Sequence, residues 1–271
     1  MTFDSNRAWK EATAAVAANR DVLWALAGVF FLLPSLAFGL FLPQPEPAAG
    51  TDQNAMMALV SEYYAKAWPF MLAVGVLQAI GTLALLTLLT DKARPTVGEA
   101  IRKGAAALLP LIGAQMLLAL ALGVVGGLVI GAAAASGSGP VTAVAVIVVL
   151  AAMIVIAVRT SLVAPVVAVE DERNPVRALQ RSWWLTRGNG ARLGVFYLLI
   201  VIGFVILVSL AIVLVGMVVL LGAGAETAKV VEAVVSAALG AAGTVYFVAI
   251  LAAAHRQLAG PSGEAIGSIF E

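Results

Sequence analysis

Six long runs without a charged residue divide the chain, and they constrain its fold more than any other feature. A hydrocarbon core about 30 Å thick is crossed by a helix of roughly 20 apolar residues, and each run is close to that length or longer. Inside such a core the backbone must satisfy its own hydrogen bonds, so the runs predict helices. We expect spans at about residues 22–42, 67–90, 105–135, 141–158, 193–221 and 233–254.

The composition favours the same class of protein. Hydrophobic residues make up 62% of the chain and charged residues 11%, whereas a soluble domain has roughly 25% charged residues. We therefore predict an all-α integral membrane protein whose residues 1–271 form a single six-span domain. Because Asp4, Glu11 and Asp21 give the N-terminal segment mixed charge, the first run is interpreted as an uncleaved span rather than a secretion signal.

Basic residues are distributed unevenly over the two sides that alternating spans would create. Of the 16 Lys and Arg residues, only Lys66 and Lys229 fall on one side. The positive-inside rule then predicts a multi-pass protein of the bacterial cytoplasmic (inner) membrane with both termini in the cytoplasm. Basic side chains next to spans face anionic lipid headgroups, so nucleic acid is not an expected partner. The other 14 are Arg7, Lys10, Arg20, Lys92, Arg94, Arg102, Lys103, Arg159, Arg173, Arg177, Arg181, Arg187, Arg192 and Arg256.

The connection between the fourth and fifth spans predicts an amphipathic helix. Asn174 suits the N-cap, Pro175 the first helical position and Gly188 a stop. An apolar face of Val176, Leu179 and Trp183 suits a helix lying in the headgroup layer. A solvated helix packed on the end of the bundle is the alternative. The candidates for binding lipid or another anion here are Arg177, Arg181, Trp183, Trp184 and Arg187.

Two other segments share features with this one. Thr96 and Glu99 predict a capping box that begins a short cytoplasmic surface helix before the third span, and Asp4 is in a cap position before the first. Each segment precedes two spans. The chain is therefore interpreted either as three repeats of an amphipathic surface helix plus a transmembrane hairpin, or as chance similarity at a few positions.

Few polar residues lie within the runs. Arg159 closes the fourth run near its cytoplasmic end, where its side chain can snorkel to lipid phosphate or form an anion site. Together with Gln78 and Gln115 it is also a candidate for lining a transport path, for which Pro34 and Pro110 are the candidate helix breaks.

A stripe of small residues follows Gln115 along the third span. Ala119, Gly123, Gly127 and Gly131 recur every four residues. Small side chains at this spacing allow helices to approach closely, so the stripe predicts tight packing within the chain rather than a dimer contact.

The segment NPVRALQRSWWLTRGNGARLGVFYLL, which begins at Asn174, resembles the six-span glycerophosphoryl diester phosphodiesterase membrane-domain family. The segment TVGEAIRKGAAALLPLIGAQMLL resembles the earlier connection of the same family. In some members this membrane part is joined to a soluble, metal-dependent barrel that hydrolyses glycerophosphodiesters. The resemblance implies the membrane part alone, and so implies the activity only by association. Its distinctive positions are Ala178, Ser182, Trp183, Leu185, Thr186, Arg187 and Gly188.

The residues themselves do not favour an enzyme. Hydrolysis needs a positioned acid and base, an activated nucleophile or a metal, whereas the chain has no Cys and only His255, which we expect to flank the last span at the interface. We expect no catalytic residue, cofactor or metal. The leading hypothesis is a non-catalytic protein that binds or organises anionic phospholipid or serves as membrane partner of another protein; the alternative is a transporter of a small solute or lipid.

The orientation can be tested by labelling. Because the chain has no native Cys, a single Cys replacing Gly50 should react with an impermeant maleimide in intact cells, whereas one replacing Gly98 should react only after lysis. Labelling of the Gly98→Cys variant in intact cells would reverse the orientation.

Overall fold

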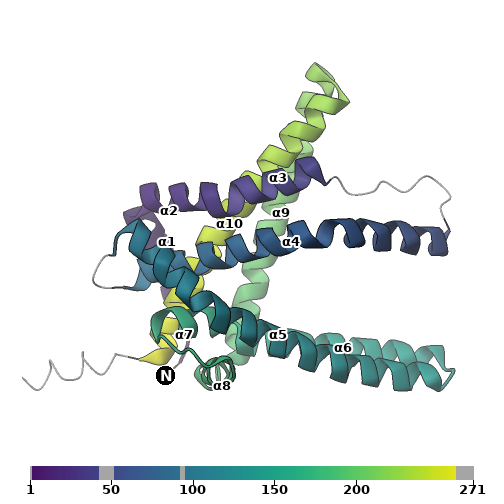
Figure 1. Ribbon diagram of the computed structural model, residues 1–271, viewed down its shortest axis with the longest axis horizontal. Helices are drawn as coiled ribbons and strands as arrows, with labels where there is room; N and C mark the ends of the chain where they lie inside the picture. Colours follow the sequence, from purple (N-terminus) through teal and green to yellow (C-terminus); the bar gives the residue numbers. More distant parts are fainter. Residues whose placement is uncertain (1, 43–51, 92–94, 261–271) are drawn as a thin grey trace, which may run out of the picture.

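The computed structural model describes residues 2–42, 52–91 and 95–260, and every regular element within these residues is helical (Figure 1). Lys92 and Arg94 lie outside the described residues. The elements are α1 (Ser5–Ala18), α2 (Arg20–Ala27), the π-helical segment η1 (Gly28–Leu32), α3 (Leu33–Phe41), α4 (Gln53–Thr90), α5 (Val97–Ala135), α6 (Gly139–Thr160), α7 (Val163–Val169), α8 (Pro175–Leu185), α9 (Gly190–Ala223) and α10 (Ala225–Ala259).

Six helical stretches in the described part of the chain are long and apolar enough to cross a membrane, which confirms this part of the sequence prediction. The first joins α2, η1 and α3, and the fourth joins α6 to α7. The stretches run Arg20–Phe41, Gln53–Thr90, Val97–Ala135, Gly139–Val169, Gly190–Gly222 and Thr227–Ala259.

The start of α5 corrects one prediction. The capping box is present, because the Thr96 hydroxyl accepts from the Glu99 N–H at 3.3 Å and the Glu99 carboxylate accepts from the Thr96 N–H at 2.9 Å. However, the helix that it begins continues without interruption to Ala135, so the predicted separate surface helix is wrong. Gly104 lies buried inside α5.

The two prolines that are candidate helix breaks for a transporter behave differently. Pro110 lies inside α5, which continues through it. Pro34 is near the start of α3, directly after the π-helical segment Gly28–Leu32. Neighbouring helices and local π geometry accommodate proline in apolar helices.

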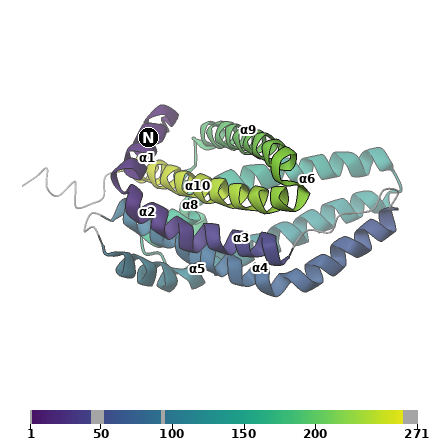
Figure 2. The ribbon, with the colours of Figure 1, turned by 90° about the horizontal axis from the view of Figure 1, so that it is seen from above.

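The helices converge at one end of the molecule, where α1, α7 and α8 lie (Figures 1 and 2). We call these three helices the collar and this end the collar end. From it the hairpins α5–α6 and α9–α10 diverge (Figure 1). The main buried cluster is here too, with Leu23 of α2, Leu86 of α4, Val166 of α7 and Ile250 of α10 fully buried. By contrast, α6 contains no buried residue, and the buried residues of α9, Leu193 and Tyr197, lie near its start.

The small-residue stripe on α5 is exposed, so the predicted packing through it is wrong. A Cβ added at Gly123, Gly127 or Gly131 would have no atom within 4 Å. The glycine that packs is Gly126, where an added Cβ would lie 3.2 Å from Val149 of α6. Because an α-helix has 3.6 residues per turn, residues four apart are rotated by about 40° at each step. A row with this spacing therefore drifts away from any one packing face.

Gly104 offers a test of the close packing between α5 and α4. A Cβ there would lie 3.0 Å from both the Ala84 nitrogen and the Ile80 oxygen, and backbone atoms cannot move aside cheaply. We expect Gly104→Ala to destabilise the protein by ~1–3 kcal/mol, measured as a lower Tm in detergent. The matched control is Gly127→Ala in the same helix, which should be neutral or stabilising by up to ~1 kcal/mol. Equal melting temperatures for the two variants would contradict this packing.

Candidate functional site

The helix α8 begins as its sequence predicts. The Asn174 side-chain oxygen accepts from the N–H groups of Val176 at 2.9 Å and Arg177 at 3.2 Å, and Pro175 takes the first helical position. The helix ends at Leu185, slightly before the predicted end, and the turn that follows includes Gly188 with a φ of 80°. Such a left-handed conformation favours glycine.

One face of α8 is buried against the bundle through small and hydroxyl side chains. Ala178, Ser182 and Leu185 are its buried residues. The Ser182 hydroxyl donates to the Arg159 carbonyl at 2.9 Å, at the end of α6, and accepts from the Leu162 N–H at 3.2 Å, just before α7. Backbone N–H and C=O groups at helix ends lack partners within the helix. Ser182 therefore supplies hydrogen-bond partners to two such groups, one at the end of α6 and one just before α7. The sequence signal for this contact is the spacing of Ala178, Ser182 and Thr186 four residues apart.

The opposite face of α8 exposes its large side chains. Trp184 is 65% exposed, Val176 47% and Trp183 44%. Of the expected apolar face, Val176 and Trp183 are exposed, whereas Leu179 is partly buried against the core. The packed face combines the small residues Ala178 and Ser182, which let the helix lie close to α6 and α7, with Leu185. Arg177 and Arg187 are also exposed, and the Arg187 guanidinium carbon lies 5.2 Å from the Trp184 ring centre, within cation–π range.

An apolar groove runs beside these tryptophans, between α5, α6 and α8. Its volume is about 370 Å³. The ring of Trp184, which stacks with Arg187, forms part of its wall, so a cation lies next to an apolar surface. The groove is lined by Leu118, Ile156, Thr160, Leu179, Gln180, Trp183 and Trp184.

The guanidinium of Arg159 contacts the protein itself. Its Nη1 donates to the Thr186 carbonyl at 2.8 Å, and its central carbon lies 5.5 Å from the Trp183 ring centre. Gly190 makes room for it, because a Cβ there would lie 3.3 Å from the guanidinium. Arg159 therefore joins the end of α6 to the end of α8. Neither snorkelling to lipid phosphate nor an anion site, the two alternatives from the sequence, includes this contact.

A charged network connects α7, α8 and α10. Glu170 receives a hydrogen bond from Arg181 Nε at 2.8 Å and lies 2.9 Å from His255 Nε2. His255 is only 4% exposed and is buried with a carboxylate partner at the end of α10, a contact that the sequence did not predict. Arg181, a predicted lipid contact, is held by this carboxylate instead of extending freely from the helix.

The pKa of Glu170 is lowered from its ordinary value. Burial by itself would raise it, but the hydrogen bonds from His255 and Arg181, together with their charges, outweigh burial. An ionised carboxylate only accepts, so His255 Nε2 must carry the hydrogen in this pair.

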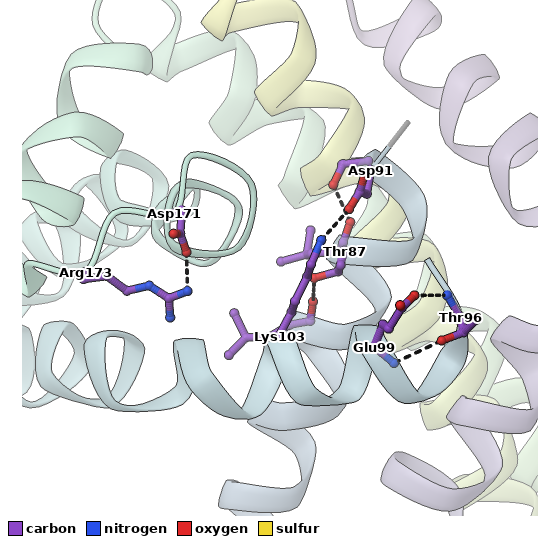
Figure 3. Close-up of polar contacts among 10 residues, drawn as sticks. Thr87, Asp91, Thr96, Glu99, Lys103, Asp171 and Arg173 are labelled. Atoms are coloured by element: carbon purple, nitrogen blue, oxygen red, sulfur yellow. Dashed lines mark hydrogen bonds and ion pairs between the residues drawn. The ribbon is translucent and has the colours of Figure 1, made fainter. Parts of the chain in front are cut away.

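A second recess, the α4–α5–α7 cleft, lies at the collar end (Figure 3). Its volume is about 580 Å³. Lys103 Nζ lies 2.7 Å from the Asp91 carboxylate, and Arg173 is paired with Asp171 in the connection between α7 and α8. The cleft is lined by Thr87, Thr90, Asp91, Lys103, Ala107, Val167, Ala168, Val169, Asp171 and Arg173.

The three residues proposed for a transport path have different neighbours. Gln78 on α4 donates to the Ser35 hydroxyl on α3 at 3.3 Å. Gln115 is exposed on α5, and Arg159 contacts α8 as described above. No described contact joins the three. In the part of the chain that the structure describes, no group of three or more acidic or His side chains could hold a metal.

A family model described as a domain of unknown function, DUF7847, matches residues 15–258. The chain belongs to this family. The DUF7847 match contains all six apolar stretches except the last residue of the sixth. It also contains α8, both recesses and the Glu170 network. No curated protein and no solved structure matches the chain.

Glu170 predicts a pH dependence of stability. The pKa of Glu170 in the folded protein lies below the ordinary value of 4.5. Its contribution to the free energy of unfolding is therefore complete at neutral pH, and is lost as the pH falls from 4.5 through the folded pKa. We expect Glu170→Gln to lower stability at pH 7 by ~1–3 kcal/mol, the range for hydrogen bonds to charged groups. The variant should also flatten the decline of Tm between about pH 5 and pH 3.

The control for this experiment is Asp21→Asn, which removes a carboxylate with a 93% exposed side chain. It should leave the acid-induced decline unchanged. An identical decline in Glu170→Gln and the wild type would show that the network contributes nothing to acid sensitivity.

Proposed function

We propose that this chain is a multi-pass protein of the bacterial cytoplasmic membrane, with both termini in the cytoplasm, and that it binds anionic phospholipid through the exposed face of α8 without catalysing a reaction. The lipid occupies the groove between α5, α6 and α8 with an acyl chain. Its phosphate lies near Arg187, with Arg177 contributing charge on the same helix.

The exposed apolar surface supports the membrane placement. The stretches in α5, α6 and α9 present large aliphatic side chains outward along their length, and hydrocarbon is the environment that accepts such a surface without cost. Lys66 lies in the first half of α4 and Lys229 near the start of α10, whereas Lys103 lies near the start of α5, Arg159 at the end of α6 and Arg187 just after α8, next to the collar. The collar is therefore on the cytoplasmic side in this proposal.

The exposed tryptophans on α8 carry the lipid part of the proposal. Trp183 and Trp184 are the residue type enriched at membrane interfaces, and here they border an apolar groove. An Arg near an anionic surface contributes about 1 kcal/mol, and Arg177 and Arg187 are both exposed for this role. The Arg159 guanidinium carbon lies 5.5 Å from the Trp183 ring centre, within cation–π range.

The same segment carried the resemblance to the glycerophosphoryl diester phosphodiesterase membrane domains, and we extend the proposal to a relationship with them. That relationship concerns the membrane fold, since the proposed role contains no catalytic step. A protein partner on the exposed face of α8 is the competing use of this surface, and the test below separates the two.

Co-purified lipid provides the test. We expect the double variant Trp184→Ala/Arg187→Gln to retain about five- to tenfold less phosphatidylglycerol or cardiolipin in native mass spectrometry, because it loses about 1 kcal/mol from the Arg and part of the groove wall. The matched control, Trp68→Ala/Lys66→Gln, removes an exposed Trp and an exposed cation from the far half of α4 and should retain wild-type lipid.

Equal retention in the two double variants would contradict lipid binding by α8. If α8 then captured a protein in membranes instead, the partner hypothesis would replace it. Flux of a small solute through liposomes containing purified protein would favour the transporter alternative.

A further inference from the structure

The α4–α5–α7 cleft is separate from the groove beside α8, and the role proposed for α8 makes no use of it. Two consecutive elements, the end of α4 and the first turns of α5, form its walls together with α7 and the connection that follows it, which are distant in sequence. Its volume of about 580 Å³ is in the range of small-ligand sites. Its charged side chains keep part of their surface open, with Lys103 54% exposed and Arg173 46%.

Among the residues of the cleft that the structure describes, two cations and two carboxylates balance. Lys103 faces Asp91 from α5, and Arg173 pairs with Asp171 on the other side of the recess (Figure 3). A ligand with only negative charge would meet the two carboxylates, and one with only positive charge would meet the two cations. A ligand with one group of each sign can pair with both kinds and leave none of these four described charges unmatched.

The threonines in the wall add a preference for a hydrogen-bond donor. The Thr90 hydroxyl donates to the Leu86 carbonyl at 2.6 Å, and the Thr87 hydroxyl donates to the Leu83 carbonyl at 2.9 Å. A hydroxyl has one hydrogen, so each oxygen has only acceptor capacity left. Thr90, which is partly exposed, therefore favours a ligand N–H next to Asp91.

The rest of the wall is apolar and belongs to the candidate spans. Ala107 of α5 and Val167 of α7 line the recess. In the membrane placement proposed above, the charged residues of the cleft are at headgroup depth, and the apolar wall continues towards the hydrocarbon. A lipid headgroup can enter here with its acyl chains beside α4 and α5.

We propose that this cleft binds a zwitterionic group composed of a phosphate and a primary ammonium, as in phosphatidylethanolamine. The phosphate pairs with Lys103 and Arg173, and the ammonium donates to Asp91, Asp171 and Thr90. The proposal rests on the proposed function only for placing the cleft at the membrane surface, and it concerns a different lipid class from the one at α8.

The test compares lipids with the same acyl chains on the full-length chain in detergent, by native mass spectrometry. We expect phosphatidylethanolamine to occupy the protein about tenfold more than phosphatidylcholine, whose quaternary ammonium has no N–H to donate. Lys103→Gln and Asp171→Asn should each abolish this preference. Asn tolerates the left-handed backbone of Asp171, whose φ is 54°, so the second variant should keep the local conformation.

The controls separate this site from α8. Lys10→Gln, at an exposed position on α1, should keep the phosphatidylethanolamine preference, as should the α8 double variant. Displacement of the lipid by soluble glycerophosphoethanolamine would show that the headgroup alone is the ligand; no displacement would show that the acyl chains are needed too. Equal wild-type occupancy by the ethanolamine and choline lipids would overturn the proposal, as would an unchanged preference in both cleft variants.

Discussion

The collar depends on one buried polar junction, where the hydroxyl groups of α8 meet the end of α6. The Arg159 carbonyl accepts from Ser182, and the Thr186 hydroxyl lies 3.3 Å from the same oxygen. Both side chains are fully buried. A carbonyl left without a partner there would cost about 1–3 kcal/mol, so α8 is held in the one position that satisfies it.

The position of α8 determines which side chains of the collar line the groove and the cleft. Because Ser182 faces the bundle, Trp183 and Trp184 face away from it, beside the groove with α5 and α6. The connection from α7 to α8 is held between these two helices, which brings Asp171 and Arg173 to the cleft beside Lys103. The N-terminal segment is joined to the same region, since the Phe3 N–H donates to the Asn189 side chain at 2.8 Å. Both proposed lipid sites therefore depend on the same junction.

The sequence predicted helix ends well where the hydrogen bonds that form them join residues a few positions apart. Asn174 and the Thr96–Glu99 pair were identified as caps because a cap is formed by residues a few positions apart. Predictions about contacts between helices were less successful. The small-residue stripe through Gly127 is exposed, and His255 is buried, because each outcome depends on which helix lies opposite. No spacing within one helix contains that information.

The sequence by itself determined the six apolar helices and the caps at Asp4, Thr96 and Asn174, since run length and hydrogen-bonding needs decide both within a segment. It also indicated α8 as the candidate site. Only the tertiary structure decided which face of α8 is buried, that Arg159 and Arg181 bind groups of the protein, and that Asp91, Lys103, Asp171 and Arg173 surround one recess. These residues come from segments up to 82 positions apart (173 − 91). Their proximity arises from packing among α4, α5 and α7, which depends on the shapes of all three helices together.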